Sequence, residues 1–188
     1  MSTSTSRTSR SMMEEAQAWK QTDLHDLWQK VKDKIPVPSW TPGKLFEYLV
    51  IRAFDAEGTS VRWPYEVTYP QKFGTMEQID GMVFLDGRSF LVESKDLSEP
   101  AAIEAVAKLR FRLESRPPGT MAVLFSVSDF TLATEVFTQF ASPLNILLWG
   151  KSDLDIALPH ATMTEGLRQK LEYATAYGLP LFPFETDE

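Results

Sequence analysis

Apolar residues recur along the chain at the spacing of helices or of buried strands. Between residues 12 and 34 they repeat at intervals of three and four, which predicts one amphipathic helix that ends before Pro36. A second helix, from about residue 41 to residue 57, is apolar on most of its sides. Because a helix that is hydrophobic all round has no face to offer to water, we expect this second helix to be largely buried.

Strands and helices alternate over the rest of the chain. The apolar runs predict strands at residues 60–69, 79–85, 88–95, 120–127 and 144–149, and helices at 98–116, 131–140 and 163–177. Asp86 and Gly87 stand between two of these strands and are a preferred pair for a two-residue hairpin turn. The order from residue 41 onward is α-β-β-β-α-β-α-β, which predicts an α/β fold with a central mixed sheet flanked by helices.

The chain of 188 residues divides into four segments by composition, and this length fits one domain with short appendages. Residues 1–11 are rich in Ser and Thr without an apolar run, and we expect a disordered tail there. Residues 12–40 are expected to form an accessory N-terminal helix, and residues 41–150 the main domain. A C-terminal helix and tail are expected over residues 151–188.

Composition narrows the chemistry. The chain has no cysteine, which excludes a disulfide scaffold, a thiolate zinc site and a Cys nucleophile, and which fits a cytoplasmic location. No segment reaches the roughly 18 uninterrupted apolar residues of a membrane helix, so we expect no membrane partner. A net charge of −7 argues against a protein that coats nucleic acid non-specifically, although a local basic patch is compatible with it. His25 and His160 fall outside the predicted core, so a zinc or His-base site has no support.

The predicted hairpin gathers charged residues on one patch of sheet. Its two-residue turn fixes a register that sets Asp80 opposite Glu93 and Gln78 opposite Lys95, all on one face. Two facing carboxylates repel each other, so a compensating charge is expected, either the Lys95 ammonium or a divalent cation. Mg²⁺ takes oxygen ligands, and the backbone carbonyl of Ser94 is a further candidate ligand.

A further acid, Glu47, lies on the buried helix among apolar neighbours. An ionised carboxylate in such surroundings is costly unless it is paired or bound to metal. Glu47 could bind a metal through a water, bind a second metal, or pair with Lys95. For any one of these residues the alternative is an ordinary ion pair on a surface hairpin, but residues 90–92 of the same strand are hydrophobic, which is not typical of a solvated face.

These residues carry a family resemblance. Ile79-Asp80 followed by Val92-Glu93-Ser94-Lys95 resembles the signature of the PD-(D/E)XK nuclease superfamily, in which an acid on one strand and an acid-x-Lys on the next form a metal-dependent phosphodiesterase site. Gly43-Lys44-Leu45-Phe46-Glu47 resembles the helix glutamate of the Mrr-like restriction endonuclease and Holliday-junction resolvase branches. The resemblance covers about residues 41–150 and implies a restriction-endonuclease-like αβββαβ core.

The sequence departs from the family pattern at two places. Ile79 stands where the signature has proline, and Ser94-Lys95 stands where many Mrr-like members have Cys-Lys. Even so, the resemblance implies a DNA endonuclease that hydrolyses phosphodiester bonds with Mg²⁺ or Mn²⁺ in restriction, defence or repair. The residues that it implies as catalytic are Glu47, Asp80, Glu93 and Lys95. Asp80 and Glu93 would bind the metal, helped by Ser94 and Glu47, and Lys95 would position the attacking water.

Two other functions remain open at this point. The first is a Holliday-junction or structure-specific resolvase that uses the same site. The second is a non-catalytic nuclease-fold interaction module, which the net acidity and the N-terminal helix, with Trp19 and Trp28 as anchors, would support.

Basic residues follow the predicted site. Lys108, Arg112 and Arg116 are spaced by four on one helix, so they form a basic ridge that could hold phosphates, or else a solvated face with acidic partners. Gln78 and Lys72 are weaker candidates for contact with DNA. Because so few phosphate contacts are available, we expect weak, salt-dependent DNA binding or a protein partner that delivers the DNA. Cutting both strands favours a homodimer.

Overall fold

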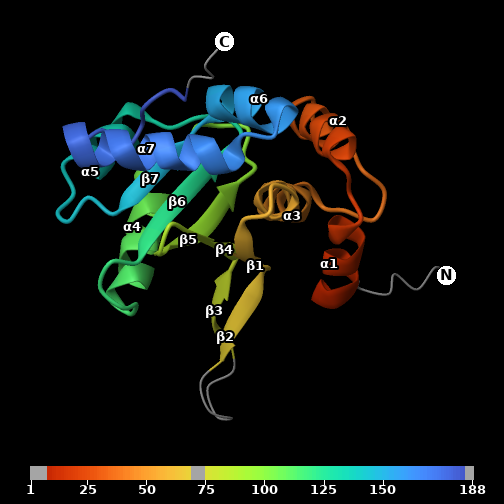
Figure 1. Cartoon of the computed structure of the whole chain (residues 1–188), viewed down its shortest axis with the longest axis horizontal. Coiled ribbons are helices and arrows are strands. Elements are labelled where there is room, and N and C mark those ends of the chain that lie inside the picture. Colours follow the sequence, from red (N-terminus) through yellow and green to blue (C-terminus); the bar gives the residue numbers. More distant parts are fainter. Residues whose placement is uncertain (1–7, 69–74, 185–188) are drawn as a thin grey trace.

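Helices cover both faces of a central sheet (Figure 1). The computed structural model describes residues 8–68 and 75–184. Its helices are α1 (Ser9–Gln17), α2 (Gln21–Lys32), α3 (Pro42–Ala56), α4 (Ile103–Glu114), α5 (Leu132–Gln139), α6 (Lys151–His160) and α7 (Met163–Tyr177). Its strands are β1 (Ser60–Arg62), β2 (Tyr65–Thr68), β3 (Thr75–Ile79), β4 (Gly81–Leu85), β5 (Arg88–Lys95), β6 (Met121–Ser126) and β7 (Ile146–Trp149).

The main sheet has the order β1-β4-β5-β6-β7. Strand β4 runs antiparallel to both β1 and β5, whereas β5, β6 and β7 run parallel to one another. The predicted α/β class with a mixed sheet flanked by helices is therefore confirmed. The core order α3-β1-β4-β5-α4-β6 is the αβββαβ order that the family resemblance implies.

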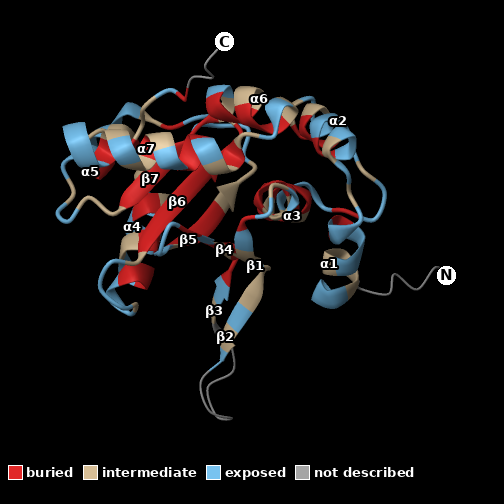
Figure 2. Cartoon of the chain, in the orientation of Figure 1, coloured by how far each residue is buried: buried red, intermediate tan, exposed pale blue. Residues whose placement is uncertain are grey.

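The two faces of the sheet carry separate hydrophobic cores, because side chains alternate between the faces along each strand. On β5, Phe90 and Val92 pack in the core with α3, while Leu91 packs in the core with α4. Figure 2 shows how deeply the middle strands are buried between the helices. Glu93 and Lys95 are in step with Leu91, so they lie on the α4 face, at the end of β5.

The hairpin between β4 and β5 forms at the predicted turn. Asp86 and Gly87 have φ angles of 49° and 75°, the left-handed conformations that a tight hairpin of this type requires. Leu85 pairs with Arg88, and the predicted register continues as far as Gly81 opposite Val92.

Two predicted strands are each split in the structure, and one predicted pairing is wrong. The segment 60–69 forms β1 in the main sheet and β2 in a separate two-stranded ribbon with β3, which extends away from the sheet (Figure 1). Gln78 pairs with Glu66 in this ribbon and does not face Lys95. The reason lies at Asp80, between β3 and β4, whose Oδ2 accepts a hydrogen bond from the Ser94 backbone N–H at 2.8 Å. The Asp80 carboxylate thus accepts the Ser94 N–H, which a backbone carbonyl would accept if the ladder between β4 and β5 continued.

Two differences lie near the ends of the chain. The segment predicted as a single accessory helix forms α1 and α2, because the Asp23 carboxylate accepts the Lys20 N–H at 2.8 Å and begins a new helix there. Most of the predicted tail, residues 1–7, lies outside the described residues. Helix α6 was not predicted. Its start is capped by Asp153, which accepts the Gly150 N–H at 2.8 Å. None of the helices in the described ranges is long and apolar enough to span a membrane.

Candidate functional site

A cavity of about 950 Å³ lies at the end of β5, between the start of α3, helix α4 and the β2–β3 ribbon. The four residues predicted as catalytic all line it, namely Glu47, Asp80, Glu93 and Lys95. Ser94 lines it as well, together with four of the five predicted DNA contacts, namely Gln78, Lys108, Arg112 and Arg116. Lys72, the fifth, lies outside the described residues.

Gly81, which has no side chain, allows α3 to lie close to the site. A Cβ atom on Gly81 would lie 2.3 Å from Cδ1 of Ile51 and 2.9 Å from the backbone oxygen of Arg62. Ile51 lies one turn after Glu47 on the same face of α3. Glycine next to Asp80 therefore allows α3 to pack directly on β4, and this packing sets Glu47 beside the Asp80 carboxylate.

Asp80 is a buried acid with little compensation. The residue is 8% exposed, and among residues 8–68 and 75–184 its carboxylate accepts one hydrogen bond, from the Ser94 N–H. Burial, followed by the negative charges of Glu47 and Glu93, raises the pKa of Asp80 from 3.8 to about 7. At neutral pH this carboxyl group therefore exchanges a proton easily, and a nearby positive charge would ionise it.

Glu93 has the opposite environment. Burial acts to raise its pKa, but Lys95, Arg112 and Lys108 together outweigh that effect, so the pKa of Glu93 lies below its usual value. The Nζ atoms of Lys95 and Lys108 lie 2.7 Å and 3.5 Å from Oε1, and Arg112 Nη1 bonds Oε2. Glu93 is thus ionised and held from both sides.

Glu47 forms an ion pair within its own helix. Its Oε2 atom lies 2.5 Å from Nζ of Lys44, one turn earlier, so the lysine partner is Lys44 and not Lys95 as one prediction had it. Burial raises the pKa of Glu47, and the charge of Glu93 adds to this effect, while Lys44 and Lys95 oppose it. Three acidic groups therefore share one cavity wall.

The backbone of Ser94 faces the Asp80 carboxylate. The Lys95 carbonyl accepts from the Val127 N–H on the β6 side at 3.1 Å. Because successive residues of a strand direct their backbone groups to alternate edges, the N–H and C=O of Ser94 point to the other edge. The ladder with β4 stops before Ser94, because β4 begins at Gly81, opposite Val92. Asp80 takes the N–H, and the carbonyl is directed to the same side.

The predicted basic ridge divides into two parts, and its last member, Arg116, lies just beyond α4, which ends at Glu114. Lys108 is the accessible part, with 55% of its side chain exposed at the cavity. The Arg112 side chain is only 7% exposed. Its Nε lies 3.0 Å from Glu77 Oε1, and its Nη2 donates to the Gln78 carbonyl at 2.5 Å. Arg116 Nη2 lies 2.6 Å from Glu77 Oε2. These bonds tie the ribbon to α4.

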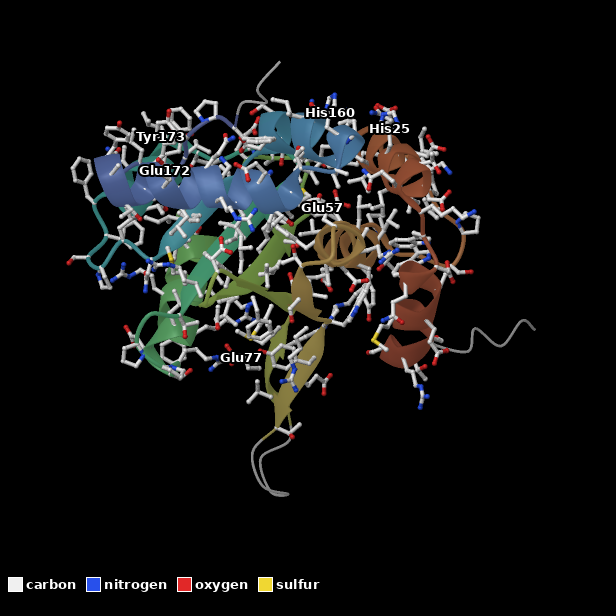
Figure 3. The ribbon with its side chains drawn as sticks, in the orientation of Figure 1. His25, Glu57, Glu77, His160, Glu172 and Tyr173 are labelled. Atoms are coloured by element: carbon white, nitrogen blue, oxygen red, sulfur yellow. The ribbon has the colours of Figure 1, made fainter. Side chains whose placement is uncertain are left out.

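Glu77 is a site residue that the sequence interpretation missed. It lies on the ribbon beside the cavity, whereas His25 and His160 lie on α2 and α6, away from the site (Figure 3). No local signal marks Glu77, because its importance depends on the split at Asp80 that turns β3 toward α4.

The oxygen donors of the site fit a hard cation. Mg²⁺ commonly uses one or two protein carboxylates and completes its shell with water and phosphate. Asp80, Glu93 and the Ser94 carbonyl provide such a set, and Asp80 in particular is short of positive charge. Within residues 8–68 and 75–184, no three His, Asp or Glu side chains are grouped closely enough to hold a metal by themselves. Any metal here would depend on two carboxylates and on water or substrate.

No protein-family model matches the sequence, and none of the curated proteins compared with it matches either. Similar solved structures include a protein of unknown function, AF1548, with 16% identity and a TM-score of 0.48 over 71% of this chain and 77% of that one. The MspJI restriction endonuclease in complex with a 27-mer oligonucleotide has 14% identity and a TM-score of 0.45, over 94% of this chain and 39% of its own. AspBHI, a DNA modification-dependent restriction endonuclease, has 13% identity and a TM-score of 0.41, over 89% and 41%.

The chain spans about two fifths of the length of each of these two restriction endonucleases. Membership of the Mrr-like branch stays a prediction.

Proposed function

We propose that this chain is a metal-dependent endonuclease that hydrolyses phosphodiester bonds of DNA, in restriction, defence or repair within the cytoplasm. One observation supports this function above the others. Glu47, Asp80, Glu93 and Lys95 come from three separate elements, and all of them line one cavity. An ordinary surface ion pair needs no such convergence.

Each of these residues has a role that its surroundings favour. Asp80 and Glu93, with the Ser94 carbonyl, would hold Mg²⁺ or Mn²⁺, which when bound supplies Lewis acidity and a more acidic water. Lys95 has 26% of its side chain exposed and is oriented by its bond to Glu93, so its ammonium can donate to the attacking water and direct it. Glu47 would accept a hydrogen bond from a water on the far side of Asp80.

The charge balance favours a site built for a cation. If the acids served only to stabilise the fold, each would have a local partner, as Glu93 and Glu47 do. Burial first, and then the negative charges of Glu47 and Glu93, raise the pKa of Asp80, so an ionised Asp80 lacks compensating positive charge. A divalent cation would supply this charge.

DNA is the proposed substrate because the cavity has a basic rim. Lys108 is placed to contact a phosphate, while Arg112 and Arg116 hold Glu93 and Glu77. Because so few basic side chains are available to phosphates, we expect weak, salt-dependent binding of DNA. A second copy of the chain, or a protein partner that delivers the DNA, would strengthen this binding.

The direct test is cleavage of plasmid and linear DNA with Mg²⁺ or Mn²⁺. We expect Asp80→Ala and Lys95→Ala to lose at least about 100-fold in rate, the scale of a lost general acid–base or positioning group. Asp26→Ala, at an exposed position on α2, is the matched control and should cleave like wild type. Equal cleavage by all four proteins would overturn the site assignment. A four-way junction beside the linear substrate tests the resolvase alternative, which requires preference for the junction.

One observation favours a second candidate, the non-catalytic interaction module. Both carboxylate oxygens of Glu93 are already bonded by basic side chains, so a metal must displace one of them. Calorimetric titration with Mn²⁺ in the presence of DNA separates the two functions. Binding that Asp80→Ala abolishes supports the enzyme, and absence of binding to wild type supports the module.

A further inference from the structure

One wall of the site cavity carries a large apolar side chain that the proposed metal chemistry does not use. Phe111, on α4, lines the cavity and is 76% exposed. Lys108, one turn before it, and Ser115, one turn after it, line the cavity too, so Phe111 belongs to the face of α4 that the cavity exposes. The apolar side chains that α4 buries in the core are those of Val106, Leu109 and Leu113. The Phe111 ring is therefore free of the core and open to a ligand.

An aliphatic side chain lies on the wall that faces α4. Val67 of the β2–β3 ribbon lines the same cavity and pairs with Glu77 across the ribbon, so these two side chains share a face. Glu77 in turn contacts Arg112 and Arg116, which shows that this face of the ribbon is turned toward α4. The cavity is thus bordered by an aromatic ring on one wall and an aliphatic side chain on the other, above the charged groups.

The space is large enough for more than a metal ion. Its volume of about 950 Å³ lies at the upper end of the roughly 300–1,000 Å³ that is usual for ligand pockets. The ring is also close to the proposed cutting site, because Lys108 Nζ, one turn earlier, lies 3.5 Å from Glu93 Oε1. One helical turn advances about 5.4 Å and stacked nucleotides are spaced by about 3.4 Å, so Phe111 lies within about two nucleotides of a phosphate held there.

We propose that Phe111 stacks on one unpaired base of the substrate strand, next to the nucleotide whose phosphate is cut. The inference rests on the proposed function and deepens it, because it assigns single-stranded or locally opened DNA as the substrate. Every base has a π face, and sites for single strands combine an aromatic ring with positive charge beside it. Lys108 supplies this charge, since its ammonium has three N–H donors and its side chain is 55% exposed. In a fully paired duplex the faces of the bases are covered by their neighbours, and the ring cannot reach them.

The test measures binding without cleavage, by fluorescence anisotropy at low salt in EDTA. One labelled strand consists of thymidines, and the other has the same length but an abasic site at every position, so it presents the same phosphates without bases. We expect Phe111→Ala to bind the thymine strand at least about fivefold more weakly than wild type, the lower end of stacking on one base, and to bind the abasic strand equally well. Phe111→Tyr keeps the ring and should bind both strands like wild type. Phe140→Ala, which removes a 77% exposed ring at the end of α5, is the matched control.

A tryptophan in place of the ring gives an independent signal, because a base that stacks on an indole quenches its fluorescence. The thymine strand should quench Phe111→Trp more than it quenches wild type, whereas the abasic strand should not. Phe140→Trp should show no such added quenching with either strand.

Several results would overturn the proposal. One is equal affinity of wild type and Phe111→Ala for the thymine strand, and another is an equal loss with both strands, which would indicate a general change in the cavity. No binding of the thymine strand by wild type also overturns it. An equal loss with a fully paired duplex would show that the ring contacts paired DNA. If Phe111→Ala turns a dimer into a monomer in sedimentation and leaves strand affinity unchanged, a second copy of the chain covers the ring.

The proposal and the nuclease function fail in different ways. Strand binding that depends on Phe111, without cleavage of plasmid or linear DNA in Mg²⁺ or Mn²⁺, supports the stacking residue and contradicts the nuclease. Cleavage by wild type, with strand affinity that Phe111→Ala leaves unchanged, supports the nuclease and contradicts the stacking residue.

Discussion

Two buried aspartates of this molecule have very different surroundings. Asp153, 2% exposed, accepts three hydrogen bonds, from Gly150 N–H at 2.8 Å, Phe184 N–H at 3.0 Å and Lys170 Nζ at 2.8 Å. Asp80, 8% exposed, accepts one from a backbone N–H and faces two other carboxylates. Burial alone therefore does not distinguish a carboxylate that stabilises the fold from one that is proposed to bind a metal.

The difference lies in how many donors each carboxylate has. Asp153 joins the start of α6, helix α7 and the C-terminal segment, and every oxygen has a partner, as expected of a buried charge that stabilises a fold. Asp80 is left short of donors in a cavity that solvent and ligands can enter. An uncompensated carboxylate of this kind is what the proposed metal site requires.

The largest effect on stability should come from breaking the buried ion pair between Asp153 and Lys170. Asp153→Asn leaves the Lys170 ammonium, whose pKa burial already lowers, without a counter-charge in the core. We expect the free energy of unfolding in urea at pH 7 to fall by about 3–5 kcal/mol, the usual cost of removing one partner of a buried ion pair. Lys170→Met should cost less, because the Asp153 carboxylate keeps its hydrogen bonds from the Gly150 and Phe184 N–H groups. If Asp153→Asn had wild-type stability, the proposed difference between Asp153 and Asp80 would be contradicted.

The same substitution at the other aspartate should have the opposite sign. The pKa of Asp80 is about 7 in the folded protein, against 3.8 for an ordinary Asp carboxyl group in the unfolded chain. Between these two values the folded state keeps a proton that the unfolded state has released. Stability from this group is present below pH 4 and is lost as the pH rises to 7. Asp80→Asn removes that loss. At pH 8 the free energy of unfolding of the variant should therefore be higher than that of wild type by about 2–4 kcal/mol. Urea unfolding from pH 4 to pH 8 measures the gap.

A gap that does not grow with pH would show that Asp80 has an ordinary environment. Added Mn²⁺ provides a second check, because a cation that binds ionised Asp80 stabilises wild type and narrows the gap at pH 8.

The sequence predicted well what local signals determine. The turn at Asp86-Gly87 needs only its own backbone preferences, and it fixed the register that brings the end of β5 beside β4. Helix α3 followed from its apolar pattern, and the joint position of Glu47, Asp80 and Lys95 at one cavity followed from both.

What the sequence did not predict depends on partners distant along the chain. The break at Asp80 arises because its side chain satisfies Ser94, a choice that strand patterns do not encode. The capture of Arg112 by Glu77 requires the ribbon to leave the sheet first. Helix α6 was missed because Pro159 reads as a helix breaker and glycine is a weak start signal, while its cap comes from Asp153.

An intermediate effect should follow from moving the two sides of the cavity apart. Gly81→Ala places a methyl group against Ile51 and the Arg62 backbone oxygen, so α3 must shift, and Glu47 with it. We expect a loss of about 1–3 kcal/mol in unfolding free energy, as for overpacked cores, and at least about tenfold slower cleavage. Gly43→Ala is the matched control on α3, since no atom lies within 4 Å of its added Cβ. If both variants behave like wild type, the close approach of α3 does not set the site.

The smallest effect on stability is expected at Lys108, the exposed residue of the basic ridge, in contrast to the buried and paired Arg112. Lys108 is 55% exposed and lies 3.5 Å from Glu93, so Lys108→Ala should change stability by no more than about 0.5 kcal/mol. If its ammonium contacts a phosphate, the slope of log affinity against log salt should fall by about 0.9. Arg112→Ala removes a buried partner of Glu93 and should lower stability by about 3 kcal/mol or more. A salt slope that Lys108→Ala leaves unchanged would place the DNA elsewhere, because Arg112 on α4 is paired with Glu93 and Arg116, just after α4, is paired with Glu77.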